Sequence, residues 1–244
     1  MAQGCLPSCA ALFCRSRRGA SGGGAVGHDA YALAARREEE GVEEYEAAMF
    51  EEEGLGPEAL EARGDRFTAA ARRRSSSRWF RVSKGGDDAA LAVAHDFKEA
   101  ALSYVLAANW RKAAPAFGNQ AVQILKVHPD RKLHLHAAFA LLRAARCYAK
   151  IPDKDKGELV AAKLGFEKAI QLYTEGEDWS KAATCCRELA DFYEEQKEWH
   201  NALHYFEEAA DYYGATTDCN GYYRRYCNDK ARKMGCIIAR AKLM

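Results

Sequence analysis

The chain has 244 residues, of which 48% are hydrophobic and 29% charged, so it can bury the core of one or two domains. Its apolar runs are far shorter than the roughly 20 residues that a transmembrane helix needs, and its net charge of +1 argues against a dedicated nucleic-acid binder. Nine cysteines without a Cys-x-x-Cys pair do not indicate a disulfide framework, which favours a reducing, cytoplasmic location.

Residues 1–60 offer little material for a core. Residues 1–28 are rich in Gly, Ala, Ser and Arg and include three consecutive glycines, which predicts disorder. The rest of this segment can form an acidic helix with a thin apolar face, because residues 38–53 carry nine Glu and no Lys or Arg. Residues 63–84, in contrast, carry eight Arg or Lys against one Asp. We therefore expect a disordered or weakly helical extension, followed by a folded domain over residues 61–244.

From residue 87 onward one pattern of residues recurs. Positions 3, 4, 7, 10, 11 and 14 after an anchor residue lie on one face of a helix of 3.6-residue period. After the anchor Trp179 these positions hold small and bulky apolar residues: Ala182, Ala183, Cys186, Leu189, Ala190 and Tyr193. Further copies follow the anchors Ala90, Trp110, His134, Leu159 and Trp199. A degraded seventh copy is expected from Tyr223.

This pattern predicts how neighbouring helices pack. Alanines at three of the positions let helix backbones approach closely, and the bulky residue and the tyrosine fill the space between turns. The anchors recur every 20 to 25 residues, which leaves a helix of about 15 residues and a short turn, so that successive helices run antiparallel. We predict an all-α fold, a TPR-like right-handed solenoid of antiparallel helical hairpins.

Individual residues mark where the helices begin. Asn109 and Asp178 precede tryptophan anchors and suit the N-cap position, whereas Glu198 is a weaker cap. Pro115 lies inside the predicted helix that follows Asn109, where proline removes a backbone hydrogen bond. The sequence therefore predicts that this helix either begins nearer Ala113 or kinks.

Three segments resemble the soluble NSF attachment protein (SNAP) family. The stretch Phe166–Tyr213, FEKAIQLYTEGEDWSKAATCCRELADFYEEQKEWHNALHYFEEAADYY, resembles this family closely, and its ending AADYY is more similar to the α/β type than to the γ type. Lys98–Phe117, KEAALSYVLAANWRKAAPAF, resembles its first full hairpin, and Glu61–Lys84 resembles its N-terminal helix and the hydrophobic loop that follows. The resemblance extends from residue 61 to about residue 240.

The resemblance implies an adaptor rather than an enzyme. Proteins of this family lie along a SNARE four-helix bundle of syntaxin-type helices and recruit the AAA ATPase NSF for SNARE disassembly in vesicle fusion and intracellular transport. It implies no catalytic residues, no cofactor, no metal and no small-molecule substrate. Family members continue past the position that corresponds to Met244 with a C-terminal bundle that engages the ATPase. The resemblance therefore implies a chain truncated at its C-terminus, with weak or absent ATPase stimulation.

The basic loop around Trp79 and Phe80 is the predicted membrane contact. Exposed aromatic rings beside Arg78 and Arg81 suit a bilayer interface, where rings enter the headgroup region and cations meet anionic lipid. In the family this loop touches the membrane. The alternative is that the two rings pack against the first helices.

Two lysines are candidates for SNARE contact. In the family, basic residues spread over one face of the repeat bind the SNARE bundle, and Lys150 and Lys230 fall near such positions. Thr184 stands where the family has a lysine, which weakens the correspondence. The alternative is that these lysines are solvated surface residues.

Two other functions remain open from the sequence. A generic TPR-like scaffold binds a peptide or a helix without any link to SNAREs. His128-Pro129-Asp130 resembles the motif by which J-domain proteins stimulate Hsp70, although proline and aspartate are ordinary in a turn between helices. His200 and His204 share a helix face but lack a third ligand, so we expect no metal site there.

Overall fold

The structure is a computed structural model, which describes residues 55–76, 86–127, 131–216 and 221–243. The backbone separates into two units, Met1–Met49 and Phe50–Met244, and all described residues belong to the second. The predicted extension therefore lies outside the described residues as far as residue 54.

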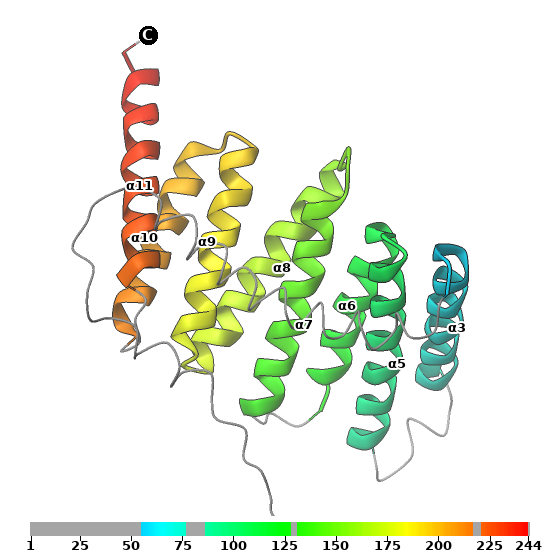
Figure 1. Cartoon of the computed structure of the whole chain (residues 1–244). Coiled ribbons are helices and arrows are strands. Elements are labelled where there is room, and N and C mark those ends of the chain that lie inside the picture. Colours follow the sequence, from blue (N-terminus) through cyan, green and yellow to red (C-terminus); the bar gives the residue numbers. More distant parts are fainter. Residues whose placement is uncertain (1–54, 77–85, 128–130, 217–220, 244) are drawn as a thin grey trace, which may run out of the picture. The chain divides into compact units, whose positions relative to one another are not determined.

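The described residues are helical, without a strand, and each helix packs against its neighbour in sequence (Figure 1). The helices are α3 (Pro57–Ser76), α5 (Gly86–Leu106), α6 (Trp110–Ile124), α7 (Arg131–Lys150), α8 (Lys156–Glu175), α9 (Trp179–Glu195), α10 (Trp199–Ala215) and α11 (Gly221–Ala241). Every predicted repeat copy, including the degraded one at Tyr223, corresponds to a helix. The predicted all-α solenoid of helical hairpins is confirmed. None of the described helices combines the length and the apolar character required to cross a membrane.

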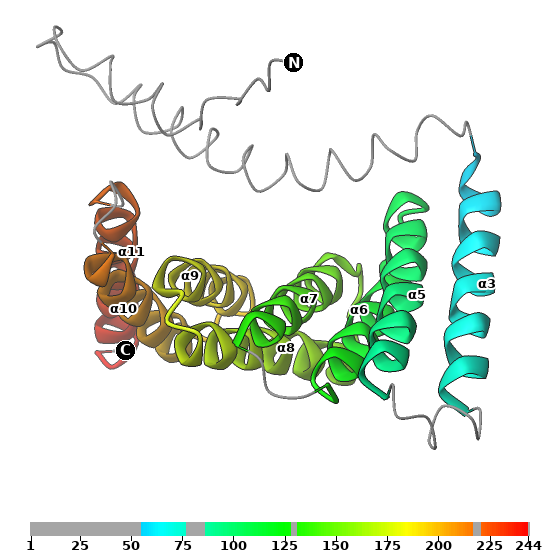
Figure 2. The same cartoon turned by 90° about the horizontal axis from the view of Figure 1, so that it is seen from below.

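Alternate helices of this unit lie side by side in two layers (Figure 2). We call α5, α7, α9 and α11 the first layer, and α6, α8 and α10 the second layer. Ion pairs join alternate helices: Arg146 of α7 pairs with α9, Lys163 of α8 with the residue before α10, and Lys230 of α11 with α9. The two layers meet at the small and bulky residues of the repeat pattern. All six pattern positions after Trp179 are at most 5% exposed.

The same type of turn joins three pairs of successive helices: α5 to α6, α8 to α9, and α9 to α10. The tyrosine that ends each repeat accepts a backbone hydrogen bond from the residue before the next anchor. These bonds are Asn109 N to Tyr104 O at 2.8 Å, Asp178 N to Tyr173 O at 2.9 Å, and Glu198 N to Tyr193 O at 2.9 Å. The residue in between is left-handed in each turn, at Ala108 (φ 54°), Glu177 (φ 55°) and Lys197 (φ 60°). Such a residue reverses the chain and gives a partner to a carbonyl at the helix end.

The predicted caps are confirmed. Asn109 Oδ1 accepts the Lys112 N–H at 3.1 Å, and Asp178 Oδ1 accepts the Lys181 N–H at 3.1 Å. Glu198 makes no side-chain cap hydrogen bond, in keeping with its weaker propensity.

The helix that contains Pro115 begins earlier than one of the predicted alternatives. α6 begins at Trp110, so a start near Ala113 is wrong. Pro115 has no N–H, so the carbonyl of Arg111, four residues earlier, lacks its helical hydrogen bond. The helix nevertheless begins before Pro115, because the Asn109 side chain caps its N-terminus.

Candidate interaction surface

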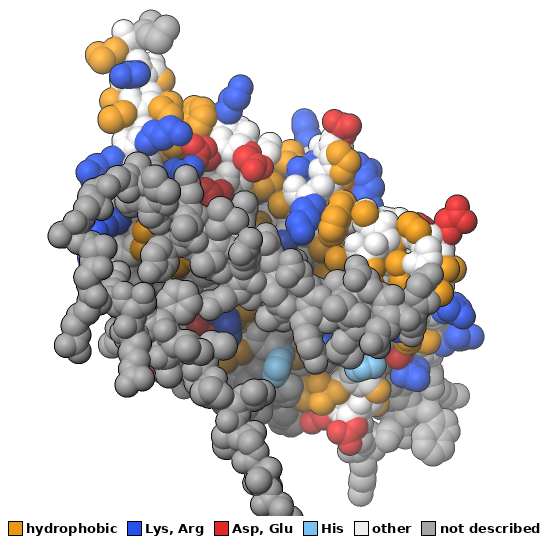
Figure 3. Space-filling model, viewed as in Figure 1, with side chains coloured by type: hydrophobic (Ala, Val, Ile, Leu, Met, Phe, Trp, Pro, Cys, Tyr) orange, Lys and Arg blue, Asp and Glu red, His pale blue; other side chains and the backbone are white. Residues whose placement is uncertain are grey.

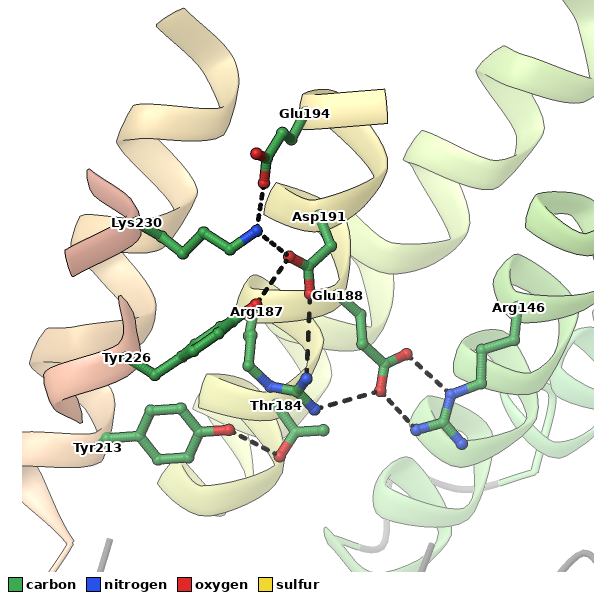
Figure 4. A network of polar contacts seen from close by, with 9 residues as sticks. All are labelled: Arg146, Thr184, Arg187, Glu188, Asp191, Glu194, Tyr213, Tyr226 and Lys230. Carbon is green, nitrogen blue, oxygen red and sulfur yellow. Dashed lines mark hydrogen bonds and ion pairs between the residues drawn. The ribbon is translucent and has the colours of Figure 1, made fainter. Parts of the chain in front are cut away.

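A stripe of polar side chains runs along α9 between its two neighbours in the first layer (Figure 4). Each member lies three or four residues from at least one other member, so they share one face of the helix. They are Thr184, Arg187, Glu188, Asp191 and Glu194. Residues of α7 meet one side of this stripe and residues of α11 meet the other, so the stripe connects three helices of the first layer.

The contact with α7 is a bidentate ion pair between Arg146 and Glu188. Arg146 donates from Nε to Glu188 Oε2 at 2.8 Å and from Nη2 to Glu188 Oε1 at 2.7 Å. Both side chains are less than a fifth exposed. Paired donors and acceptors with this geometry give directional as well as electrostatic stabilisation. Arg187 Nη2 lies 4.0 Å from Glu188 and continues the network along α9.

The contact with α11 centres on Lys230. Its Nζ donates to Glu194 Oε2 at 2.6 Å and lies 3.7 Å from Asp191 Oδ1. Burial opposes the ionisation of Glu194, but the hydrogen bonds from Lys230 and Lys233 outweigh it and lower the pKa of this carboxyl. Burial raises the pKa of Asp191 despite the nearby cations of Arg187 and Lys230. The Tyr226 hydroxyl also donates to Asp191 Oδ1, at 3.5 Å.

The structure places the two lysines that were predicted to contact SNAREs in different surroundings. Lys230 is a quarter exposed, with its ammonium between two carboxylates of α9. Lys150 is exposed at the end of α7, and its Nζ lies 4.8 Å from the ring centre of Trp110. The two lysines are therefore not brought together. Thr184 stands where the resemblance implies a lysine, and its hydroxyl oxygen lies within hydrogen-bond distance, 3.3 Å, of the Tyr213 hydroxyl oxygen.

Several predicted residues cannot be placed. The membrane-contact residues Trp79, Phe80, Arg78 and Arg81 lie outside the described residues, and so does the motif at 128–130. Both assignments stay predictions. His200 and His204 are on α10, and the described part of the chain contains no group of three His, Cys, Asp or Glu side chains that fits a metal ion.

A second feature is a cleft of about 300 Å³ between α5 and α7 of the first layer and α6 of the second layer. Apolar and basic side chains and one amide line it: Leu91, Ala94, His95, Lys98, Gln120, Ile124, His136, Phe139 and Arg143. On the face that it views, Figure 3 shows histidines among hydrophobic side chains. The guanidinium of Arg143 is held over Phe117, 4.4 Å from the ring centre, and over Phe139 at 5.6 Å. The cleft contains no carboxylate among its lining residues, so it suits an apolar or anionic segment.

The ion-pair network was missed in the sequence. The spacing of Arg187, Glu188, Asp191 and Glu194 on one helix face is a signal that was available. Their partners on α7 and α11 lie 36 to 42 residues away along the chain, and only the stacking of the helices reveals them. The network neutralises most of its own charges. It joins α7, α9 and α11, whereas Lys150 lies outside it and is exposed.

These features together define a class of protein, namely a stack of helical hairpins of TPR-like type. The family model "Soluble NSF attachment protein, SNAP" matches residues 62–232, more than half of the chain. The chain belongs to the SNAP family, which consists of non-enzymatic adaptors related to SNAREs and NSF.

Two further comparisons add little. No curated protein matches the chain. Among solved structures, the crystal structure of BtubC (BKLC) from P. vanneervenii is similar over 74% of this chain and 71% of that chain, with 17% sequence identity and a TM-score of 0.45. A likeness at this level supports no functional argument.

Proposed function

We propose that this chain is an adaptor that binds assembled SNARE complexes and recruits the NSF AAA ATPase to them, as a peripheral protein on the cytosolic face of a membrane. The observation that carries the proposal is the SNAP family match, which includes all of α5 to α10. The stack of hairpins supports it, because its length offers many weak side-chain contacts to an extended helical partner.

The first layer is the proposed SNARE-binding side. It contains the exposed cation of Lys150 and the cleft with His95, Lys98 and His136, and basic groups of this kind complement an anionic helix surface. The network of Figure 4 contributes by holding α7, α9 and α11 in register, so that the exposed groups keep a fixed spacing.

A pull-down on SNARE bundle tests the proposal. The purified chain should bind the assembled four-helix bundle and not its separate helices, and NSF should be retained on the bundle only when the chain is present. Lys150→Glu should weaken binding, while Lys168→Glu, an exposed position on α8 in the second layer, serves as the charge-matched control. Equal binding to an unrelated coiled coil would favour the generic scaffold instead.

Membrane contact through Trp79 and Phe80 is the second part of the proposal. The expectation rests on two aromatic residues between Arg78 and Arg81. A Trp79→Ser, Phe80→Ser double variant should lose binding to liposomes with anionic lipid and retain binding to SNARE bundle in solution. Leu164→Ser on α8, which removes an exposed apolar side chain (54% exposed) elsewhere, is the control. Full retention of liposome-dependent activity by the double variant would contradict this contact.

A further inference from the structure

The last turn of α3 joins three consecutive arginines to two serines. Arg72, Arg73 and Arg74 precede Ser75 and Ser76, and Ser76 is the last residue of the helix. Ser76 is exposed and Ser75 is half-buried. The Ser76 hydroxyl donates to the Arg73 carbonyl at 3.1 Å, a local bond within the final turn. Carbonyls of a last turn have no helical partner, so this turn opens easily.

The three arginines differ in what they contact. Arg74 donates to Asp96 Oδ2 of α5 at 2.7 Å, and the Asp96 side chain is only 7% exposed, so this pair anchors the helix end. Arg72 and Arg73 are exposed, and no acidic side chain in the described ranges pairs with either of them. The end of α3 therefore presents two guanidinium groups to an outside partner.

This arrangement matches what an arginine-directed Ser/Thr kinase reads. Such kinases select substrates by charge and bind arginines three and two residues before the acceptor. Among the serines and threonines that the structure describes, only Ser75 and Ser76 have arginine at both places. Exposure and position favour Ser76 over Ser75. A kinase binds its acceptor in an extended segment, and Ser76, as the last residue of α3, leaves the helix with the fewest backbone hydrogen bonds broken.

We propose that Ser76 is a phosphoacceptor for an arginine-directed kinase, and that its phosphate weakens attraction of this end of the chain to anionic lipid. The second half rests on the membrane contact proposed above. In the transfer, Ser76 Oγ forms a bond to the γ-phosphorus of ATP. The bond from that phosphorus to the β–γ bridging oxygen breaks, ADP leaves with that oxygen, and the hydroxyl proton passes to the kinase's base.

The charge change has a definite sign and size. A phosphoserine carries about −1.5 to −2 charges at pH 7. It lies one turn after Arg72 and Arg73 on the same helix face, so it offsets the two guanidinium charges that the helix end presents. Basic residues near an anionic membrane each contribute affinity, and phosphorylation of such clusters releases them. Offsetting two cations is expected to weaken vesicle binding roughly tenfold to thirtyfold at physiological salt.

The experiment uses the full chain and the catalytic subunit of cyclic-AMP-dependent protein kinase with ATP. Intact mass and peptide mapping should show one phosphate on Ser76, greatly reduced in Ser76→Ala and retained in Ser75→Ala. Arg73→Gln should slow the transfer, since it removes the arginine three residues before Ser76. Ser180→Ala, at an exposed position without arginines before it, is the control.

The phosphorylated and unmodified chains are then sedimented with phosphatidylserine-containing vesicles and with neutral phosphatidylcholine vesicles. The expected result is weaker binding of the phosphorylated chain to the anionic vesicles only. Failure of the chain to accept phosphate at Ser76, or equal binding by both forms, would overturn the inference while the membrane contact stands. Absence of binding by the unmodified chain would overturn the membrane contact and, with it, the switch.

Discussion

Tyr104 of α5 donates its hydroxyl hydrogen to Oδ1 of Asp65 on α3 across 2.7 Å, and this bond joins residues 39 positions apart. Lys112 of α6 reaches the same carboxylate at 3.0 Å and 3.2 Å. The Tyr104 hydroxyl also lies 3.2 Å from Thr68 Oγ1. One carboxylate thus connects the first described helix to both members of the hairpin that follows.

Acid should loosen this junction. The hydrogen bonds from Tyr104 and Lys112 lower the pKa of Asp65 below its ordinary value near 3.8. A depressed folded-state pKa contributes stability that is present above the unfolded value and is lost as pH falls through the folded value. We expect urea denaturation followed by circular dichroism to show this loss below pH 4. Asp65→Asn should lower stability at pH 7 and flatten this part of the profile. Asp211→Asn, on the exposed side of α10, should leave the profile unchanged.

Gly64 allows Tyr104 to approach α3. A Cβ atom at this position would lie 2.6 Å from Tyr104 Cε1, closer than real contacts permit, and the Tyr104 ring is buried. Gly64→Ala should therefore destabilise the protein by about 1–3 kcal/mol through overpacking. Gly118→Ala in α6 is the matched control, because nothing lies within 4 Å of its added Cβ. There we expect a gain of about 0.5–1 kcal/mol from helix propensity. Equal effects of the two substitutions in chemical denaturation would contradict this account.

Local patterns predicted the helices, and their packing supplied the rest. The repeat places buried residues such as Phe206 and Leu189 correctly because burial follows the 3.6-residue period within a single helix. The left-handed turn residues Ala108, Glu177 and Lys197 were not predicted, since none is the glycine or asparagine that usually marks such a position.

The charged surface was less predictable for a different reason. Arg146 and Glu188 meet across 42 residues of sequence, and many other acidic and basic residues would have fitted a pairing rule equally well. The partners of Lys163 could not be predicted either, because Lys163 occupies a pattern position that holds a small or apolar residue in the other copies. In the structure Lys163 Nζ donates to Glu198 Oε1 at 2.6 Å and lies 4.8 Å from the ring centre of Tyr193. Such partners are defined by how α8, α9 and α10 stack.

The pair Arg146–Glu188 should show strong coupling in a double-mutant cycle. Both side chains are about four-fifths covered and joined by two short hydrogen bonds. We expect a coupling free energy of about 1–2 kcal/mol for Arg146→Ala with Glu188→Ala. The more exposed pair Lys181–Asp178 is the comparison, with about 0.5 kcal/mol or less that high salt largely removes. Coupling no greater at the first pair than at the second would show that the network does not brace α7 against α9.

Of the two candidate lysines, we expect Lys230 to contribute mainly to stability and Lys150 mainly to SNARE binding. Burial acts to lower the pKa of Lys230, but the hydrogen bond to Glu194 and the nearby negative charges outweigh it and raise the pKa, so Lys230 is charged in the folded state. Lys230→Gln leaves Asp191 and Glu194 with one cation fewer and should lower the free energy of unfolding by about 1–2 kcal/mol. Lys150→Gln loses only an exposed contact with Trp110, worth about 0.5–1 kcal/mol.

Binding to assembled SNARE bundle should be weakened more by Lys150→Gln than by Lys230→Gln, the opposite of their effects on stability. It is measured at temperatures where both variants are folded. Because the Lys150 ammonium is exposed and has no carboxylate partner among the described side chains, its removal should weaken binding several-fold and make it less sensitive to salt. Lys230→Gln should change affinity less, since its charge is already compensated by α9. A larger loss of SNARE binding with Lys230→Gln than with Lys150→Gln would mean that the partner opens the network of Figure 4, and that this network, not the exposed end of α7, is the contact surface.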